Sequence, residues 1–134
     1  MTAEHIDWGG QREDGPTAEE LAFTTSLNAL APGLDYWLHA DDDGTPWLLV
    51  SLDLIQEHVI RDTLRLDFDA RGLRSGWSPS CLNWDDGVRA EEALIDLAGP
   101  DGLLVPANGS SVEDLARRAA EWFTHPKQGR WAHS

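Results

Sequence analysis

The sequence has very little cysteine and lysine: one residue of each. A single cysteine, Cys81, excludes an internal disulfide framework and cysteine-rich zinc sites. No apolar run approaches the roughly 20 residues that a membrane-spanning helix needs. The first 16 residues are polar, so we expect no signal peptide and a cytoplasmic protein. The length of 134 residues is that of one domain that buries its own core.

Motifs for catalysis and metal binding are also missing. The sequence contains no G-x-S-x-G elbow, no glycine-rich phosphate loop and no H-E-x-x-H. Two aspartates follow Cys81, and their charge disfavours a reactive thiolate. The aspartates at 41–43 precede Gly44, but they lack the alternating spacing of a calcium loop. We therefore expect no metal, no cofactor and no catalytic residues, with structural or solvated roles for His39, His58 and His125.

Positive charge is scarce as well. The 24 acidic and 10 basic residues give a net charge of −14. Such a surface repels phosphate backbones and anionic lipids, so we expect neither nucleic acid nor a membrane as a partner. Opposite charge accelerates encounter, which favours a basic protein partner. The simpler alternative is that the acidity only maintains solubility.

Hydrophobic periodicity predicts an N-terminal helix followed by strands. A capping box of Thr17 and Glu20 begins a helix over about 17–31, with Leu21, Phe23, Leu27 and Leu30 in its apolar stripe. Alternating runs joined by short turns predict a three- to four-stranded antiparallel meander. The expected strands cover about 35–41, 46–55, 59–69 and 73–78. Asp43-Gly44 is a hairpin signal, and Gly72 is the expected left-handed residue of a later turn.

The C-terminal part is expected to be mainly helical. One helix covers about 87–98, and another begins at Ser110 or Ser111, with Glu113 completing a capping box on Ser110, and ends before Pro126. Leu103 to Val105 offers a short additional strand. The predicted fold is α+β, with both C-terminal helices packed on one sheet face. Residues 1–16 are expected to form an irregular arm, 17–126 the domain and 127–134 a tail.

Seven tryptophans stand out against these ordinary features. On the first two strands, Trp37 and His39 alternate away from the core, as does Trp47. Arg61 and Arg65 occupy the matching face of the third strand. Aromatic residues with arginines are typical of interface cores. The face is therefore a candidate partner surface; the alternatives are a covering segment of the same chain or a ligand-binding face.

The stretch "GWSPSCLNWDDGV" at 76–88 holds two more tryptophans. We interpret it as a strand end, a turn and a helix cap. Trp77 and Trp84 are expected to fix this connection onto the body and to border the same surface as Trp37 and Trp47.

These features favour a small acidic protein-binding module without catalytic activity. In layout and charge the chain is similar to immunity proteins that neutralise basic toxins and to small acidic secretion chaperones. The alternative is a small-molecule binder or small enzyme with a pocket between sheet and helices, where Trp37, His39, Arg61 and Arg65 would bind an anionic or planar ligand. A third interpretation is a homodimer formed through the tryptophan-bearing face.

Overall fold

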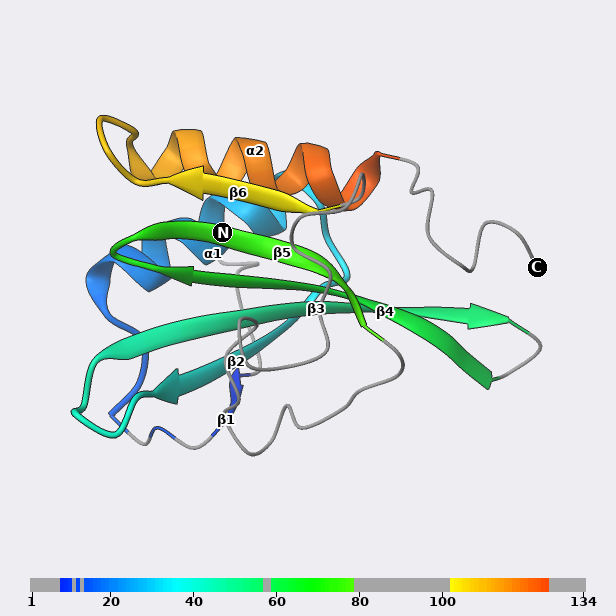
Figure 1. Ribbon diagram of the computed structural model, residues 1–134, viewed down its shortest axis with the longest axis horizontal. Coiled ribbons are helices and arrows are strands. Elements are labelled where there is room, and N and C mark those ends of the chain that lie inside the picture. Colours follow the sequence, from blue (N-terminus) through cyan, green and yellow to red (C-terminus); the bar gives the residue numbers. More distant parts are fainter. Residues whose placement is uncertain (1–7, 11, 13, 57–58, 79–101, 126–134) are drawn as a thin grey trace.

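The computed structural model describes residues 8–10, 12, 14–56, 59–78 and 102–125 (Figure 1). Its helices and strands, in chain order, are β1 (Trp8–Gly10), α1 (Ala18–Leu30), β2 (Asp35–Ala40), β3 (Pro46–Gln56), β4 (Val59–Asp69), β5 (Gly72–Ser78), β6 (Leu103–Pro106) and α2 (Val112–Thr124). The α+β class is confirmed, and the four predicted strands of the meander agree with β2 to β5 within a residue or so. The predicted helix at 87–98, the tail at 127–134 and Trp84 lie outside the described residues.

The described strands form one sheet in the order β1-β2-β3-β4-β5-β6. Strands β2 to β6 pair with one another antiparallel, and the predicted short strand at 103–105 is part of β6. β1 pairs with β2 in parallel, so the prediction of an irregular arm over 1–16 is wrong at Trp8–Gly10. A Cβ on Gly9 would lie 2.7 Å from the Trp37 ring, which explains why this strand needs glycine.

Helix α1 begins as its sequence predicts. The Thr17 hydroxyl accepts a hydrogen bond from the Glu20 amide, and the Glu20 carboxylate accepts one from the Thr17 amide. Phe23 and Leu27 are buried, as predicted. Leu21 and Leu30 are not: they are 50% and 54% exposed, because they lie to either side of the buried stripe.

Helix α2 begins one residue later than the capping-box prediction. Ser111 is the N-cap, and its hydroxyl accepts a hydrogen bond from the Asp114 amide. The predicted box between Ser110 and Glu113 is wrong, since the Ser110 amide donates to the Ala107 carbonyl in the preceding turn. The apolar face of α2, including Leu115, Ala119 and Phe123, is buried.

Both described helices pack on one face of the sheet, with the main core between the two layers (Figure 1). At its centre Phe23 of α1 stacks on Phe68 of β4, with ring centroids 4.1 Å apart. Leu48 and Val50 of β3 face the same core, as the alternation predicts. The opposite face of the sheet carries the residues predicted to form a surface.

Candidate functional site

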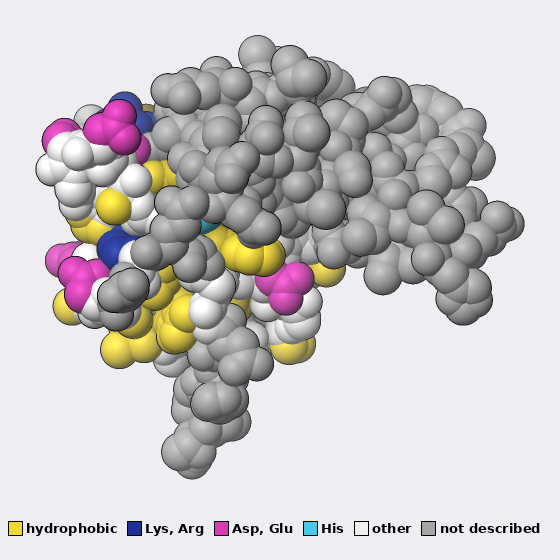
Figure 2. All heavy atoms as spheres, turned by 90° about the horizontal axis from the view of Figure 1, so that it is seen from below, with side chains coloured by type: hydrophobic (Ala, Val, Ile, Leu, Met, Phe, Trp, Pro, Cys, Tyr) yellow, Lys and Arg dark blue, Asp and Glu magenta, His cyan; other side chains and the backbone are white. Residues whose placement is uncertain are grey.

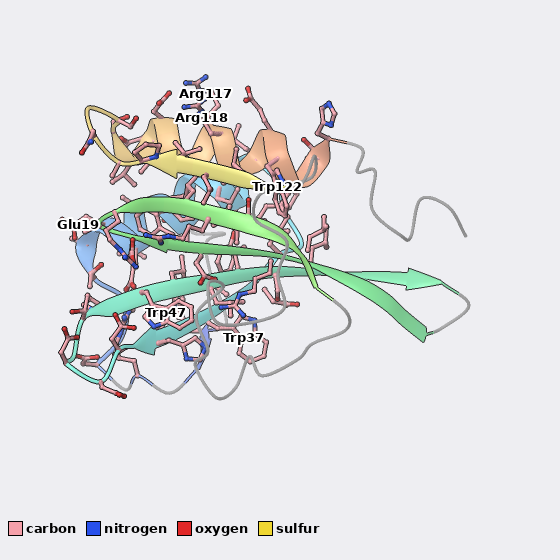
Figure 3. All side chains as sticks on the ribbon, in the orientation of Figure 1. Glu19, Trp37, Trp47, Arg117, Arg118 and Trp122 are labelled. Atoms are coloured by element: carbon pink, nitrogen blue, oxygen red, sulfur yellow. The ribbon has the colours of Figure 1, made fainter. Side chains whose placement is uncertain are left out.

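The strand register brings most of the predicted site residues onto one face of the sheet. Trp37 lies opposite Leu49, and His39 lies opposite Trp47. Arg65 lies opposite Ser51 on the next strand. Because cross-strand partners share a face, the alternation in the sequence identified this group correctly. Figure 3 shows Trp37 and Trp47 on the side of the sheet away from the helices.

Most of these side chains are buried and do not form an exposed surface. Trp47, His39 and Arg65 are fully buried. Trp37 is partly exposed, and its indole nitrogen donates a hydrogen bond of 3.1 Å to the Ser51 hydroxyl. The burial of these three side chains disagrees with a surface open to a partner and is what the alternative of a covered face predicts.

A buried ion pair occupies the middle of this face. Arg65 donates from Nε and Nη2 to the two carboxylate oxygens of Asp67, at 2.9 and 3.2 Å. The Arg65 guanidinium carbon lies 5.8 Å from the centre of the Trp47 ring, and the His39 and Trp47 rings are 4.9 Å apart. Two parallel hydrogen bonds and an aromatic neighbour offset part of the cost of removing both charges from water. This arrangement fits a structural cluster better than a site that meets a ligand.

Two of the other predicted site residues, Arg61 and Trp77, are placed by their strand positions alone. Trp77 pairs with Leu64, which belongs to the main core, so its register position is on the helix side of the sheet. Arg61 lies at a β-bulge, where Leu54 pairs with Asp62 and Ile55 with Ile60. The structure describes the backbone of Arg61 and Trp77 and not their side chains.

A pocket at one end of the molecule is the second candidate site. It lies where both helices begin and where the β2–β3 and β4–β5 turns meet the β6–α2 loop, at the left in Figure 1, and encloses about 350 Å³. We call it the end pocket. Its apolar walls are Pro46, Phe68, Ala70, Ala107, Val112 and Leu115. Its polar residues are Thr17, Glu19, Glu20, Thr45, Asp69 and Ser110.

Of the three described carboxylates that line the end pocket, two are neutralised by arginine. Glu20 is buried and pairs with Arg12, whose side chain also donates to the His39 carbonyl. Asp69 is buried and lies 3.4 Å from an Arg71 nitrogen and 3.6 Å from an Arg74 nitrogen. Glu19 is exposed and forms no ion pair with any other described residue.

The end pocket was not predicted from the sequence, although part of the signal is present there. In a meander, alternate turns lie at the same end of the sheet, which places the predicted turns near 43 and 71 together. A helix that precedes β2 begins at that end when its connection to the strand is short. The hollow itself depends on the sizes of side chains that are far apart in the sequence, and no local pattern encodes it.

Comparison of the chain with family models, with curated proteins and with solved structures finds no match. Within the described ranges, no three His, Cys, Asp or Glu side chains gather closely enough to hold a metal ion. No helix in this part of the chain has the length and apolar character needed to cross a membrane.

Proposed function

We propose that this protein binds a basic protein partner through its acidic exposed surface and acts as a binding module, not as an enzyme. The supporting observation is the imbalance of exposed charge. The described residues include seven exposed acidic side chains but only three exposed arginines, Arg71, Arg117 and Arg118. The acidic ones are Asp14, Glu19, Asp35, Asp42, Asp43, Glu113 and Glu121.

The acidic side chains are spread over several elements. They come from the segment before α1 and its first turn, from the start of β2, from the hairpin between β2 and β3, and from both ends of α2. On the face seen in Figure 2, most of the visible acidic side chains lie toward the left, the end that carries the turns. A distributed negative field steers a positively charged partner and repels phosphate-bearing ones. The proposal therefore excludes nucleic acid and anionic membranes as partners. We further propose a cytoplasmic location.

A quantitative pull-down at two salt concentrations tests this proposal. The bait is the full chain, beside a variant carrying Asp42→Asn, Glu113→Gln and Glu121→Gln. All three side chains are exposed, so the substitutions leave the core intact. We expect a basic protein that is retained at low salt, released at high salt and retained less by the variant.

Arg118→Gln is the matched control, because it removes an exposed charge of the opposite sign from the same helix. It should retain the partner at least as well as the unmodified chain. Equal retention by all three baits, or a partner without a basic surface, would contradict the proposal.

The end pocket favours a second candidate function, the binding of a small molecule. Ligand pockets typically enclose about 300–1,000 Å³ and combine apolar walls with a few polar groups. The end pocket, at about 350 Å³, lies near the lower limit of that range. It differs from the pocket expected from the sequence, because Trp37, His39 and Arg65 do not line it, and the structure does not describe the side chain of Arg61.

A further inference from the structure

We infer that the end pocket binds a small organic cation. This ligand has a small apolar part inside the pocket and one ammonium group beside Glu19. This inference rests on the second candidate function and names its ligand class.

The apolar walls of the end pocket determine which part of the ligand can lie inside it. Phe68 of β4 and Leu115 of α2 are buried core residues, and Val112 and Pro46 are partly exposed. Their side chains offer no hydrogen bond, so the inner part of the pocket favours an aromatic or branched aliphatic group. A volume near 350 Å³ suits a compact molecule better than a peptide segment.

The two helix starts would ordinarily favour an anion, but here caps and acidic side chains weaken that preference. A helix N-terminus carries about half a positive charge and several amides without partners. In α1 the Thr17 hydroxyl accepts from the Glu20 amide, and in α2 the Ser111 hydroxyl accepts from the Asp114 amide. Acidic residues fill both first turns, which further neutralises the dipoles. The capped helix starts, with acidic side chains in their first turns, therefore attract an anion less strongly than uncapped ones would.

The balance of charge around the end pocket determines the sign of the ligand's charged group. Arg12 compensates Glu20, while Arg71 and Arg74 compensate Asp69. Glu19 lines the end pocket, is exposed, and has no ion pair to any described residue that would compensate its carboxylate. Figure 3 shows Glu19 at the end of the molecule where the helices begin. The net charge of −14 adds to the attraction of a cation and to the repulsion of an anion.

Three probes with the same aromatic body test the inference: phenethylamine, phenethyl alcohol and hydrocinnamate. Each is titrated into isotopically labelled protein, and binding is followed by the amide resonances of pocket residues such as Thr45, Ala107 and Ser110. We expect the amine to bind most tightly and the carboxylate most weakly. Since exposed ion pairs contribute little, the advantage of the amine over the alcohol should be roughly two- to five-fold.

Glu19→Gln should remove this advantage and leave the affinity for the alcohol unchanged. The matched control is Glu113→Gln, because Glu113 occupies the same position in the first turn of α2 and does not line the end pocket. It should preserve the preference for the amine. Val112→Trp should fill the pocket and abolish binding of all three probes. Ala70→Phe, at an exposed turn position, serves the same purpose if the helix substitution impairs folding.

The outcomes separate the ligand class from the pocket's function. If the alcohol or the carboxylate binds as tightly as the amine, the cationic class is wrong while small-molecule binding stands. If none of the probes shifts the pocket resonances, both the inference and the second candidate function fail. If the amine binds equally well to Glu19→Gln, its charge is recognised elsewhere and the inference is overturned.

Discussion

At the scale of single residues, Tyr36 makes the clearest prediction about pH. Its side chain is buried, and within the described part of the molecule its hydroxyl has no hydrogen-bond partner. Burial, and secondarily the charge of Asp35, raises the pKa of Tyr36 above its ordinary value near 10. The folded state thus holds the phenolic proton more tightly than the unfolded state. Stability contributed by this group is present below pH 10 and is lost as the pH rises through the folded-state pKa.

Because the sequence contains one tyrosine, the absorbance of tyrosinate reports on Tyr36 alone. We expect tyrosinate to appear together with the change in tryptophan fluorescence that marks alkaline unfolding. Tyr36→Phe should weaken the loss of stability at high pH and, at neutral pH, be as stable as the unmodified chain or up to about 1 kcal/mol more stable. Titration near pH 10 with native fluorescence would show that the hydroxyl is open to solvent.

The candidate face shows what the sequence reveals about single residues. Alternation placed Trp37, His39, Trp47 and Arg65 on one side of the sheet, and the register agrees. Alternation does not report burial, which depends on packing between distant parts of the chain. The ion pair of Arg65 with Asp67 was predictable from the sequence, because residues two apart on a strand share a face.

At the scale of elements, the start of α2 gives a prediction that distinguishes two adjacent serines. Ser111 caps the helix, whereas the Ser110 amide belongs to the preceding turn. Ser111→Ala should lower the free energy of unfolding by about 1 kcal/mol, because the Asp114 amide loses its acceptor. Ser110→Ala should have a smaller effect. Urea unfolding followed by circular dichroism measures both, and a larger loss for Ser110→Ala would support the capping box expected from the sequence.

The elements themselves were predictable where the signals are local. The capping box of α1 and the turn at Asp43-Gly44 each depend on residues within one turn of the chain. Strand β1 was not predictable, since three residues with two glycines carry no strand signal. It forms because β2 offers a free edge and because Gly9 lets the backbone approach the Trp37 ring.

At the scale of the whole molecule, the α+β class followed from the order of periodic segments, and the acidic character followed from composition alone. The end pocket did not follow from either. It arises because two helix starts, two turns and the β6–α2 loop converge at one end of the sheet. Each of these parts is local, but their convergence is a property of the folded topology.

The net charge makes a prediction about the whole molecule. Exposed acidic side chains outnumber exposed arginines in the described residues, so the folded state carries unfavourable repulsion. Raising the ionic strength from about 0.01 M to 0.1 M shortens the screening length from about 30 Å to about 10 Å. The buried pair of Arg65 and Asp67 is screened far less than the exposed charges. We therefore expect the thermal unfolding midpoint at pH 7 to rise by a few degrees over this range.

Sodium chloride and potassium chloride should give the same rise, because screening depends on ionic strength and not on a specific cation. The variant with Asp42→Asn, Glu113→Gln and Glu121→Gln should begin from a higher midpoint and respond less to salt, since part of its repulsion has been removed. A midpoint that falls with salt would mean that exposed ion pairs, such as Asp114 with Arg117, outweigh the repulsion. In that case the acidic surface would be balanced within the fold, and the electrostatic attraction proposed for a basic partner would lose its physical basis.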